Sequence, residues 1–431
     1  MKEEKLYPRR WAVLTGLTII LVALQFSFIV PGGAAALVFM NYGINPMQFS
    51  MVMSIPYLSG ILFGILSGVL ADRYGFNKVI VVGFAFALIG AIWRAFSGTS
   101  YLQLFISSFI MGIATAALNA NSAKIVRTWF PGKSNSVAMG IYVAGLSGGA
   151  ALALFYGSRV TVLTDAWFLS AGLIAVGIVA WLVLYRRHPD GDTQIQENIS
   201  EYLGIVLKNK DVWGISIFAM LFFGMTNVNG QYCVAAMSAL GGGDPAAILE
   251  AGSISTVNTV IGCICSIALP AVIAMFSRLR GPVIFCMVAT GILFCLPYFL
   301  PFGLPTWIIY IILPVFFGPI MAITKMLPAL LPSVKQEHLG AVGGVQSTFQ
   351  NVGFFALASY VLSPIAMAVD PTGGLPYYQA IFVGVLVVCL LVAASLFLFP
   401  NVRTSVAAKI ADDHAAAAAA GVSADAAPSA E

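Results

Sequence analysis

The chain has 431 residues, of which 60% are hydrophobic and only 9% are charged, and its formal net charge is +4. Soluble domains contain roughly 45–50% apolar and about 25% charged residues, so this composition cannot cover a surface that faces water. It excludes an ordinary soluble protein. The basic residues are scattered between apolar runs and form no block, so nothing here predicts a nucleic-acid partner.

Twelve apolar runs follow one another, each long enough to cross the roughly 30 Å hydrocarbon core as a helix. They are continuous, whereas strands of a membrane barrel alternate apolar and polar residues over about ten positions. The sequence therefore predicts an all-α membrane protein with twelve transmembrane helices. The runs cover residues 11–40, 47–71, 77–97, 101–128, 134–158, 166–185, 212–238, 250–276, 282–301, 305–331, 339–368 and 377–399.

The first run follows Arg9 and Arg10, as the apolar part of a signal peptide would. It is too long for a signal peptide and lacks a clear cleavage site of small residues, so we expect it to remain as the first membrane helix.

The longest polar interval within the membrane region separates the sixth run from the seventh. Inside it Ile195, Ile199, Tyr202 and Val206 recur at helical spacing, which predicts a short amphipathic helix on the membrane surface. The residues after Pro400 are rich in alanine and have little to bury, so we expect a disordered tail. The predicted divisions are a first six-helix bundle (1–186), a cytoplasmic linker (187–211), a second six-helix bundle (212–399) and a cytoplasmic tail (400–431).

The distribution of Lys and Arg predicts the orientation, because loops that stay in the cytoplasm carry the excess of these residues. With the amino terminus inside, the basic residues lie on the inner side except for Arg94 and Arg159 at outer helix ends and Lys325 within a helix. We therefore expect a multi-pass protein of the inner (cytoplasmic) membrane with both termini in the cytoplasm.

The residue types used for catalysis or metal binding do not form clusters in the sequence. All six cysteines lie within apolar runs, and Cys263 and Cys265 are too closely spaced for a CxxC pair. No His, Cys and Asp cluster has metal-ligand spacing, and no serine is accompanied by a plausible base. We expect no enzymatic activity, no cofactor and no bound metal.

A polar loop between the second and third helices reads Gly68-Val-Leu-Ala-Asp72-Arg73-Tyr-Gly75-Phe-Asn-Lys78. It resembles GxLADRxGRK, the signature loop of the major facilitator superfamily, in the acid, the arginine, both glycines and the trailing base. Phe76 and Asn77 depart from the pattern. The loop between the eighth and ninth helices keeps Arg278, Arg280 and Gly281 but lacks the acid, as a degenerate second copy would.

The resemblance implies two pseudo-symmetric six-helix bundles, in which Asp72 caps and pairs with neighbouring helix ends and so locks the cytoplasmic face in one state. Arg73 and Lys78 would supply its partners. Physically, an acid at the membrane boundary is costly unless it is paired, so breaking the pair can be a two-state event. The alternative is a turn whose charges only fix the topology.

The exit of the fourth helix, from Ala123 to Pro131, and the start of the fifth, Ala138-Met-Gly140, are similar to facilitators of the oxalate/formate, monocarboxylate, cyanate and nitrate branches. Those branches mostly carry small anions. The paired arginines expected of nitrate porters have no counterpart in the second or eighth helix, which argues against nitrate.

Glycines recur in two of the helices at spacings that allow close approach of backbones in lipid. We expect these positions to serve helix packing: Gly60, Gly64 and Gly68 in the second helix, and Gly140, Gly145, Gly148 and Gly149 in the fifth.

Lys325 is the clearest candidate for contact with a solute. It lies in the tenth helix, seven residues before Pro332 and about 10 Å from the inner helix end. A charge at this depth is a functional hypothesis by default. Aligning Gly112 with Gly318 places it opposite Asn119, and we expect both to face a central cavity where the lysine attracts an anion. The alternative is a structural lysine bonded to helix carbonyls.

Neutral polar residues on other helices need partners in lipid, so several must point toward protein or water. Some would contact the substrate and others would join helices, and the sequence does not separate the two groups. The predicted substrate contacts are Gln25, Tyr57, Tyr142, Asn227, Gln231, Gln346 and Gln350, in addition to Lys325 and Asn119.

No Asp or Glu lies deep inside a predicted helix, and a proton relay usually needs such a group. This favours a secondary transporter that moves a small anion, with a carboxylate preferred, by exchange or facilitated transport. The alternatives are a proton-coupled exporter of amphipathic compounds and a membrane sensor or scaffold that transports nothing. The expected partners are a small solute and the lipid bilayer, and we expect the protein to function as a monomer.

Overall fold

The computed structural model describes residues 7–130, 134–186, 204–269, 273, 278–334 and 339–402, and these contain helices but no strand. Twelve helices or helix pairs are long and apolar enough to cross a membrane, which confirms the predicted number of spans. The surface linker helix, apart from Val206, and all but the first residues of the tail lie outside the described residues.

The first six spans use eight helices: α1 (Arg10–Gly33), α2 (Ala35–Tyr42), α3 (Pro46–Tyr74), α4 (Phe76–Ala95), α5 (Tyr101–Met111), α6 (Ile113–Trp129), α7 (Ser134–Gly157) and α8 (Leu163–Leu184). The last six use α10 (Lys210–Leu240), α11 (Pro245–Ala268), α13 (Arg280–Cys295) with η1 (Leu296–Phe299), α14 (Leu304–Leu330), α15 (Leu339–Ala356) with the π-helical η3 (Leu357–Leu362) and α16 (Ser363–Val369), and α17 (Leu375–Ser395) with η4 (Leu396–Leu398).

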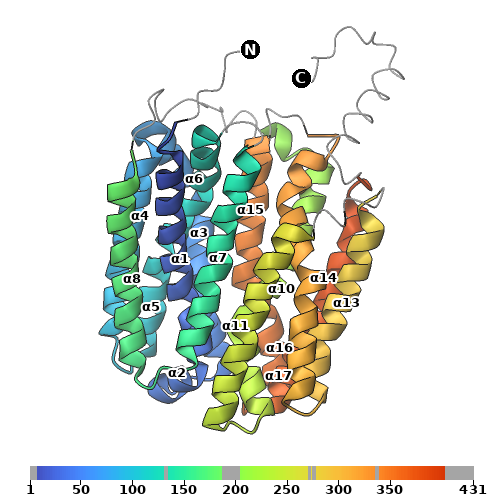
Figure 1. Ribbon diagram of the computed structural model, residues 1–431. Coiled ribbons are helices and arrows are strands. Elements are labelled where there is room, and N and C mark those ends of the chain that lie inside the picture. The colour runs from blue at the N-terminus through green and yellow to red at the C-terminus, as the bar shows by residue number, and fades with distance from the viewer. Residues whose placement is uncertain are drawn as a thin grey trace.

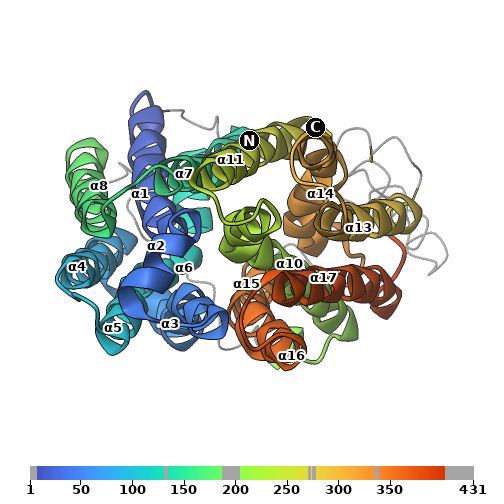
Figure 2. The ribbon, with the colours of Figure 1, turned by 90° about the horizontal axis from the view of Figure 1, so that it is seen from below.

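The two sets form two bundles that stand side by side (Figures 1 and 2). Helices α7 and α11 meet along one side of the boundary, and α3 meets α15 and α16 along the other. The described chain begins and ends on one face, which we call the terminal face, and we call the other the opposite face (Figure 1). Helices α3 and α11 run from the opposite face to the terminal face, whereas α7 and α10 run the other way.

Two predicted spans of the first bundle are interrupted rather than continuous. The first run ends as α1 near Pro31 and resumes as the short α2, and the fourth is divided at Gly112. A Cβ built on Gly112 would lie 2.3 Å from the carbonyl oxygen of Pro56 in α3. Only glycine allows this approach, so the break lets α5 and α6 wrap against α3.

Local sequence signals fix both ends of α3, which carries the resemblance to the signature loop. At its start the Asn45 side chain accepts a hydrogen bond from the Gln48 amide, and Gln48 Oε1 accepts one from the Asn45 amide. This is a capping box, with Pro46 in the first turn. At its end Gly75 has φ of +87°, a conformation that side chains rarely adopt, and the chain turns directly into α4.

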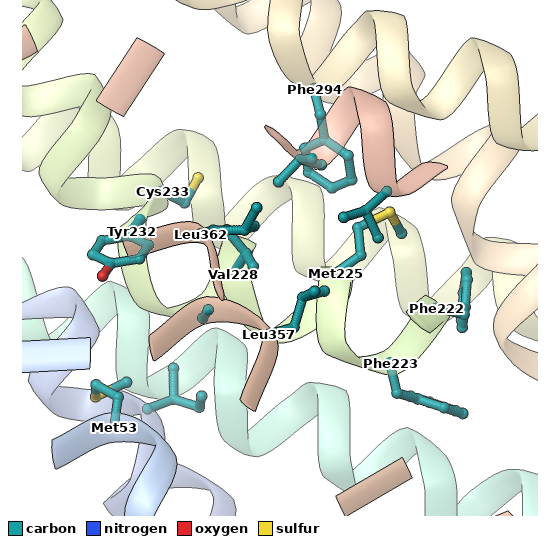
Figure 3. Packing of buried hydrophobic residues seen from close by; sticks show 14 of the residues in the cluster. Met53, Phe222, Phe223, Met225, Val228, Tyr232, Cys233, Phe294, Leu357 and Leu362 are labelled. Atoms are coloured by element: carbon teal, nitrogen blue, oxygen red, sulfur yellow. The ribbon is translucent and has the colours of Figure 1, made fainter. Parts of the chain in front are cut away.

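The buried apolar residues form two clusters. The first lies within the first bundle toward the terminal face, around Leu17, Phe84 and Trp181. The second combines the second bundle with residues of the first bundle near the opposite face, such as Val38, Phe49 and Trp167. Part of it is drawn in Figure 3, where Met53 of α3 is shown with the α10 residues Met225 and Val228. The bundles therefore share a core toward the opposite face.

Arg94 is the largest charged side chain inside the first bundle, with only 2% of its surface exposed. One terminal nitrogen donates to the Ser27 carbonyl oxygen at 2.9 Å and the other to Ser108 Oγ at 2.8 Å. The guanidinium lies 5.3 Å from the ring centre of Trp167. It thus joins α4 to α1, α5 and α8, a role that the sequence analysis did not predict.

Replacing Arg94 with lysine should destabilise the protein. A lysine keeps the buried charge but cannot reach two acceptors at once or stack flat on the indole. We expect a loss of about 1–3 kcal/mol, the cost of leaving one buried polar group unsatisfied. The measurement is thermal unfolding of the purified protein in detergent. The matched control is Arg186→Lys at an exposed position, and equal melting temperatures for the two variants would contradict this account.

Candidate substrate site and the closed opposite face

Four polar side chains join the bundles in the half nearer the opposite face. Ser50 Oγ donates to Gln231 Oε1 at 2.7 Å, and Gln231 Nε2 donates to Ser54 Oγ at 3.0 Å. Ser359 in η3 shares hydrogen bonds with the hydroxyls of both Ser50 and Ser54. All four residues have 0% of their surface exposed. We call this set the serine–glutamine network; in this conformation it occupies the boundary and contains Gln231, one of the predicted substrate contacts.

Backbone contacts reinforce the network. A Cβ built on Gly32 of α1 would lie 2.5 Å from the carbonyl oxygen of Gly230 in α10. One built on Gly252 of α11 would lie 1.9 Å from Ser158 Oγ, which follows α7. Arg159 also donates to Ser253 Oγ at 2.8 Å. Helices of the two bundles therefore touch directly, and the opposite face is closed.

The loop after α16 adds a further contact at the opposite face. The Asp370 carboxylate accepts hydrogen bonds from the Thr372 hydroxyl and from the backbone amides of Thr372 and Gly374. These bonds, that of the Thr372 hydroxyl above all, lower the pKa of the exposed carboxyl. The turn places Gly373, at φ of +73°, so close to Pro46 of the first bundle that a Cβ would lie 2.6 Å from the proline ring.

Toward the terminal face the contacts between α3 and the second bundle end. A Cβ on Gly60 would lie 3.0 Å from Asn351 Nδ2, whereas one on Gly64 or Gly68 meets no atom within 4 Å among the described residues. The packing role expected for Gly64 and Gly68 therefore stays a prediction. Gly145 and Gly149 do pack closely on α1, whereas a Cβ on Gly140 or Gly148 meets no described atom within 4 Å. Contacts of Gly64 and Gly68 with the second bundle would require the two bundles to close toward the terminal face.

Lys325 lies where the contacts between the bundles end. Its Nζ donates a hydrogen bond to Gln350 Oε1 of α15 and lies 4.8 Å from the ring centre of Phe223 in α10. The side chain thus points toward helices of its own bundle that also face the boundary, and it remains accessible to solvent. The partner found for its ammonium is a side-chain amide rather than a helix carbonyl.

Asn119 of α6 lies across the boundary from this lysine. It bonds to Asn351 of α15, the residue that follows Gln350. Its Nδ2 donates a hydrogen bond to Asn351 Oδ1 at 3.4 Å, which joins α6 of the first bundle to α15 of the second. Lys325 and Asn119 therefore bond to two successive residues of α15, Gln350 and Asn351. They do not bond to each other directly, although the sequence alignment set them opposite one another.

Tyr57 of α3 forms the other contact across the middle of the boundary. Its ring stacks on Phe354 of α15, with centres 4.5 Å apart and planes at 28°. On its other side it meets Phe28 of α1 edge to face at 6.2 Å. Among the predicted substrate contacts, Tyr57 is thus the one whose ring packs on the second bundle.

The remaining predicted contacts bond mainly within one bundle. Asn227 Nδ2 donates to the Phe354 carbonyl oxygen at 2.7 Å, and Gln346 Nε2 donates to the Thr324 carbonyl oxygen at 2.7 Å. Tyr142 is hydrogen-bonded to Ser122. Gln25 is half-buried where α1 packs on Gly149.

In the loop that resembles the signature, Arg73 is exposed and lies 5.3 Å from the ring centre of Tyr74, and Lys78 is exposed. The side chain of Asp72 lies outside the described residues, although its backbone is part of α3.

Sequence reasoning missed Ser50, Ser54 and Ser359. Serine is common in membrane helices, where its hydroxyl can bond to the preceding turn, so a single serine gives no distinctive signal. A weak signal was present in the spacing of Ser50 and Ser54, which are four residues apart and therefore on one face of α3.

Comparison with known proteins identifies the family. The model of the Major Facilitator Superfamily matches residues 15–358 of the chain. The chain belongs to this superfamily, and its fold of twelve spans in two six-helix bundles is the fold of these transporters.

The similar solved structures include a bacterial homologue of the human lysosomal transporter Spinster, at 16% identity and a TM-score of 0.72 over 91% of this chain and 97% of that one. The nucleoside transporter NupG matches at 14% identity and a TM-score of 0.71, over 91% and 99% of the two chains. At these identities the likeness concerns the fold.

Curated relatives match over shorter segments. A probable nitrate/nitrite antiporter of Thermus thermophilus is 26% identical over 51% of this chain and 52% of its own length. A hexuronate transporter of Escherichia coli is 22% identical over 50% and 54%. The quinolone resistance protein NorB of Staphylococcus aureus is 25% identical over 37% and 34%. The chain spans at most about half the length of each of these relatives.

Replacing Gly32 with alanine should open the opposite face. The added Cβ would collide with the Gly230 carbonyl oxygen, and overpacking of this kind costs about 1–3 kcal/mol. The population of the open form should rise roughly fivefold or more. The measurement uses a variant without the six native cysteines that carries Ser54→Cys, and follows the rate at which a polar maleimide labels this buried position.

The matched control is Gly172→Ala in the same background, at an exposed position on α8 where a Cβ meets no described atom within 4 Å. This control should label at the rate of its parent. Equal labelling rates for the two alanine variants would show that the contact between Gly32 and Gly230 does not hold the face closed.

Proposed function

We propose that this protein is a secondary transporter that moves a small organic anion, preferably a carboxylate, by alternating access. One observation carries the proposal: Lys325 is an exposed residue at the boundary between the bundles, and the partner found for its ammonium is neutral. A cation at such depth is costly, and a negatively charged solute would offset the cost. The nitrate/nitrite and hexuronate relatives both support an anionic solute.

The arrangement of contacts supports the alternating step. The serine–glutamine network and the contact between Gly32 and Gly230 close the opposite face, while Lys325 and Asn119 are accessible on the other side of the barrier. Rocking the bundles about the level of Tyr57 and Asn351 would break the first set and bring Gly64 and Gly68 toward the second bundle. The site would then be exposed to each side in turn.

Exchange or facilitated transport fits the titratable groups better than a proton carrier in the protein does. Among the described helices, acidic residues occur near the ends, as Asp165 in the first turn of α8 and Asp211 in the first turn of α10. Glu250, in the second turn of α11, accepts a hydrogen bond from Trp307. None of these lies beside Lys325.

A proton-coupled exporter of amphipathic compounds is the second candidate, because NorB is among the relatives. Counterflow in proteoliposomes without a pH gradient separates the two: exchange of a labelled carboxylate should persist for the antiporter and be weak for the exporter. A sensor or scaffold would show no flux, with or without a pH gradient.

Replacing Lys325 with glutamine should abolish anion binding and leave the protein folded, since it removes the charge at similar side-chain length. The charged hydrogen bond and the attraction together contribute roughly 2–3 kcal/mol, so the apparent Kd should rise at least thirtyfold. The measurement is the thermal stabilisation of purified protein by a panel of carboxylates.

Two variants control this measurement. Lys208→Gln removes an exposed lysine within the predicted linker and should leave binding unchanged. Lys325→Arg keeps the charge and should retain part of the binding. Undiminished stabilisation in Lys325→Gln would refute the assignment of this lysine to the substrate.

We further propose that the loop from Gly68 to Lys78 closes the terminal face in the other transport state, with Asp72 pairing with helix ends or bases of the facing segment. Asp72→Asn should then slow exchange severalfold or more while carboxylate binding to the resting protein is retained. Unchanged exchange would favour the alternative, a turn that only fixes the topology.

A further inference from the structure

Aromatic side chains lie beside Lys325. Phe223, whose ring faces the ammonium, meets Phe354 edge to face with centres 5.7 Å apart and planes at 61°. Phe354 in turn stacks on Tyr57, and Tyr57 meets Phe28. We call Phe223, Phe354, Tyr57 and Phe28 the aromatic row. It begins at the lysine in the second bundle and ends in the first bundle.

Lys325 and Gln350 together suit a single carboxylate head. Gln350 uses its oxygen for Lys325, which leaves its NH₂ group as a donor beside the ammonium. Neighbouring amides are tied to the protein: Asn227 and Gln346 each donate one N–H to a backbone carbonyl, and Asn351 accepts from Asn119.

The geometry also separates the two ends of a bound solute. A head bound at Lys325 and Gln350 contacts the second bundle alone, because both residues belong to it. A body that extends along the aromatic row reaches Tyr57 and therefore the first bundle. An apolar body is thus the part of the solute that contacts both bundles. Burial of this part would stabilise the arrangement in which the bundles close around it.

We propose, building on the anion transport proposed above, that the substrate is a monocarboxylate with a planar or branched apolar body, rather than an inorganic anion or a sugar acid. The head is held by Lys325 and Gln350, and the body packs against Phe223, Phe354 and Tyr57. The Phe223 ring also faces the ammonium, since a cation is attracted to an aromatic face.

The test compares benzoate, formate, nitrate and glucuronate as ligands of the purified full-length protein, by thermal stabilisation and by inhibition of benzoate counterflow in proteoliposomes. Benzoate should bind roughly ten- to a hundredfold more tightly than formate or nitrate, from burial of one ring. It should also bind more tightly than glucuronate, whose hydroxyls would lose water against the aromatic row.

Variants distinguish the body from the head. Tyr57→Leu and Phe354→Leu should reduce the preference for benzoate over formate severalfold, whereas Lys325→Gln should weaken both acids together. The matched control is Phe285→Leu, at an exposed position on α13, which should change neither.

The outcomes separate this inference from the proposed function. If formate, nitrate or glucuronate binds as tightly as benzoate and Tyr57→Leu keeps the same preference, the aromatic row does not select the substrate, and anion transport still stands. If none of the four anions binds and none is exchanged, the proposed function fails, and this inference fails with it.

Discussion

A polar group inside a membrane has no water to bond with, so its hydrogen bonds must come from the protein or from a wet cavity. The structure meets this constraint in two ways. Arg94, in one bundle, is bonded to the Ser27 carbonyl and the Ser108 hydroxyl. The side chains of Ser50, Ser54, Gln231 and Ser359 bond to one another across the boundary. The first arrangement can be permanent, but the second holds only while the bundles touch.

A boundary built from such groups can open without a large loss. Neutral hydrogen bonds contribute only about 0.5–1.5 kcal/mol each in net terms, because water replaces the partner when the groups separate. An apolar boundary of the same size would instead expose surface at roughly 25 cal/mol per Å². The serine–glutamine network therefore suits a contact that forms and breaks in each cycle, whereas the shared apolar core around Phe49 and Trp167 favours the closed form.

The fold was readable from the sequence because its strongest signal is long and repeated. Twelve apolar runs predict twelve spans, and the acid, arginine and glycines from Gly68 to Gly75 resemble the signature of the family that the chain belongs to. The break at Gly112 was not readable, since it depends on the carbonyl of Pro56, which is distant in sequence. The roles of Arg94 and Ser359 were missed for the same reason: Ser27 lies 67 residues from Arg94, and Ser50 lies 309 residues from Ser359.

The predicted site residues show the limit of arguing from depth alone. Depth singled out Lys325, because a charge within a span stands out. It could not separate Gln231, which the structure buries in the network, from Gln350, which contacts the lysine. Both are amides on long helices, and only the packing of α10, α14 and α15 decides which one faces the accessible side.

The charge of Lys325 explains, on the proposed function, why exchange would be favoured over uncoupled cycling. Closing the terminal face around an unoccupied Lys325 would remove the ammonium from water with only Gln350 and the Phe223 ring as partners. Desolvating an uncompensated charge costs several kcal/mol even after relaxation. A bound carboxylate neutralises the ammonium, and an apolar body against Tyr57 adds burial that only the closed form provides. The loaded carrier would then cross between its two states faster than the empty one, and this difference in rates is what makes a carrier an exchanger.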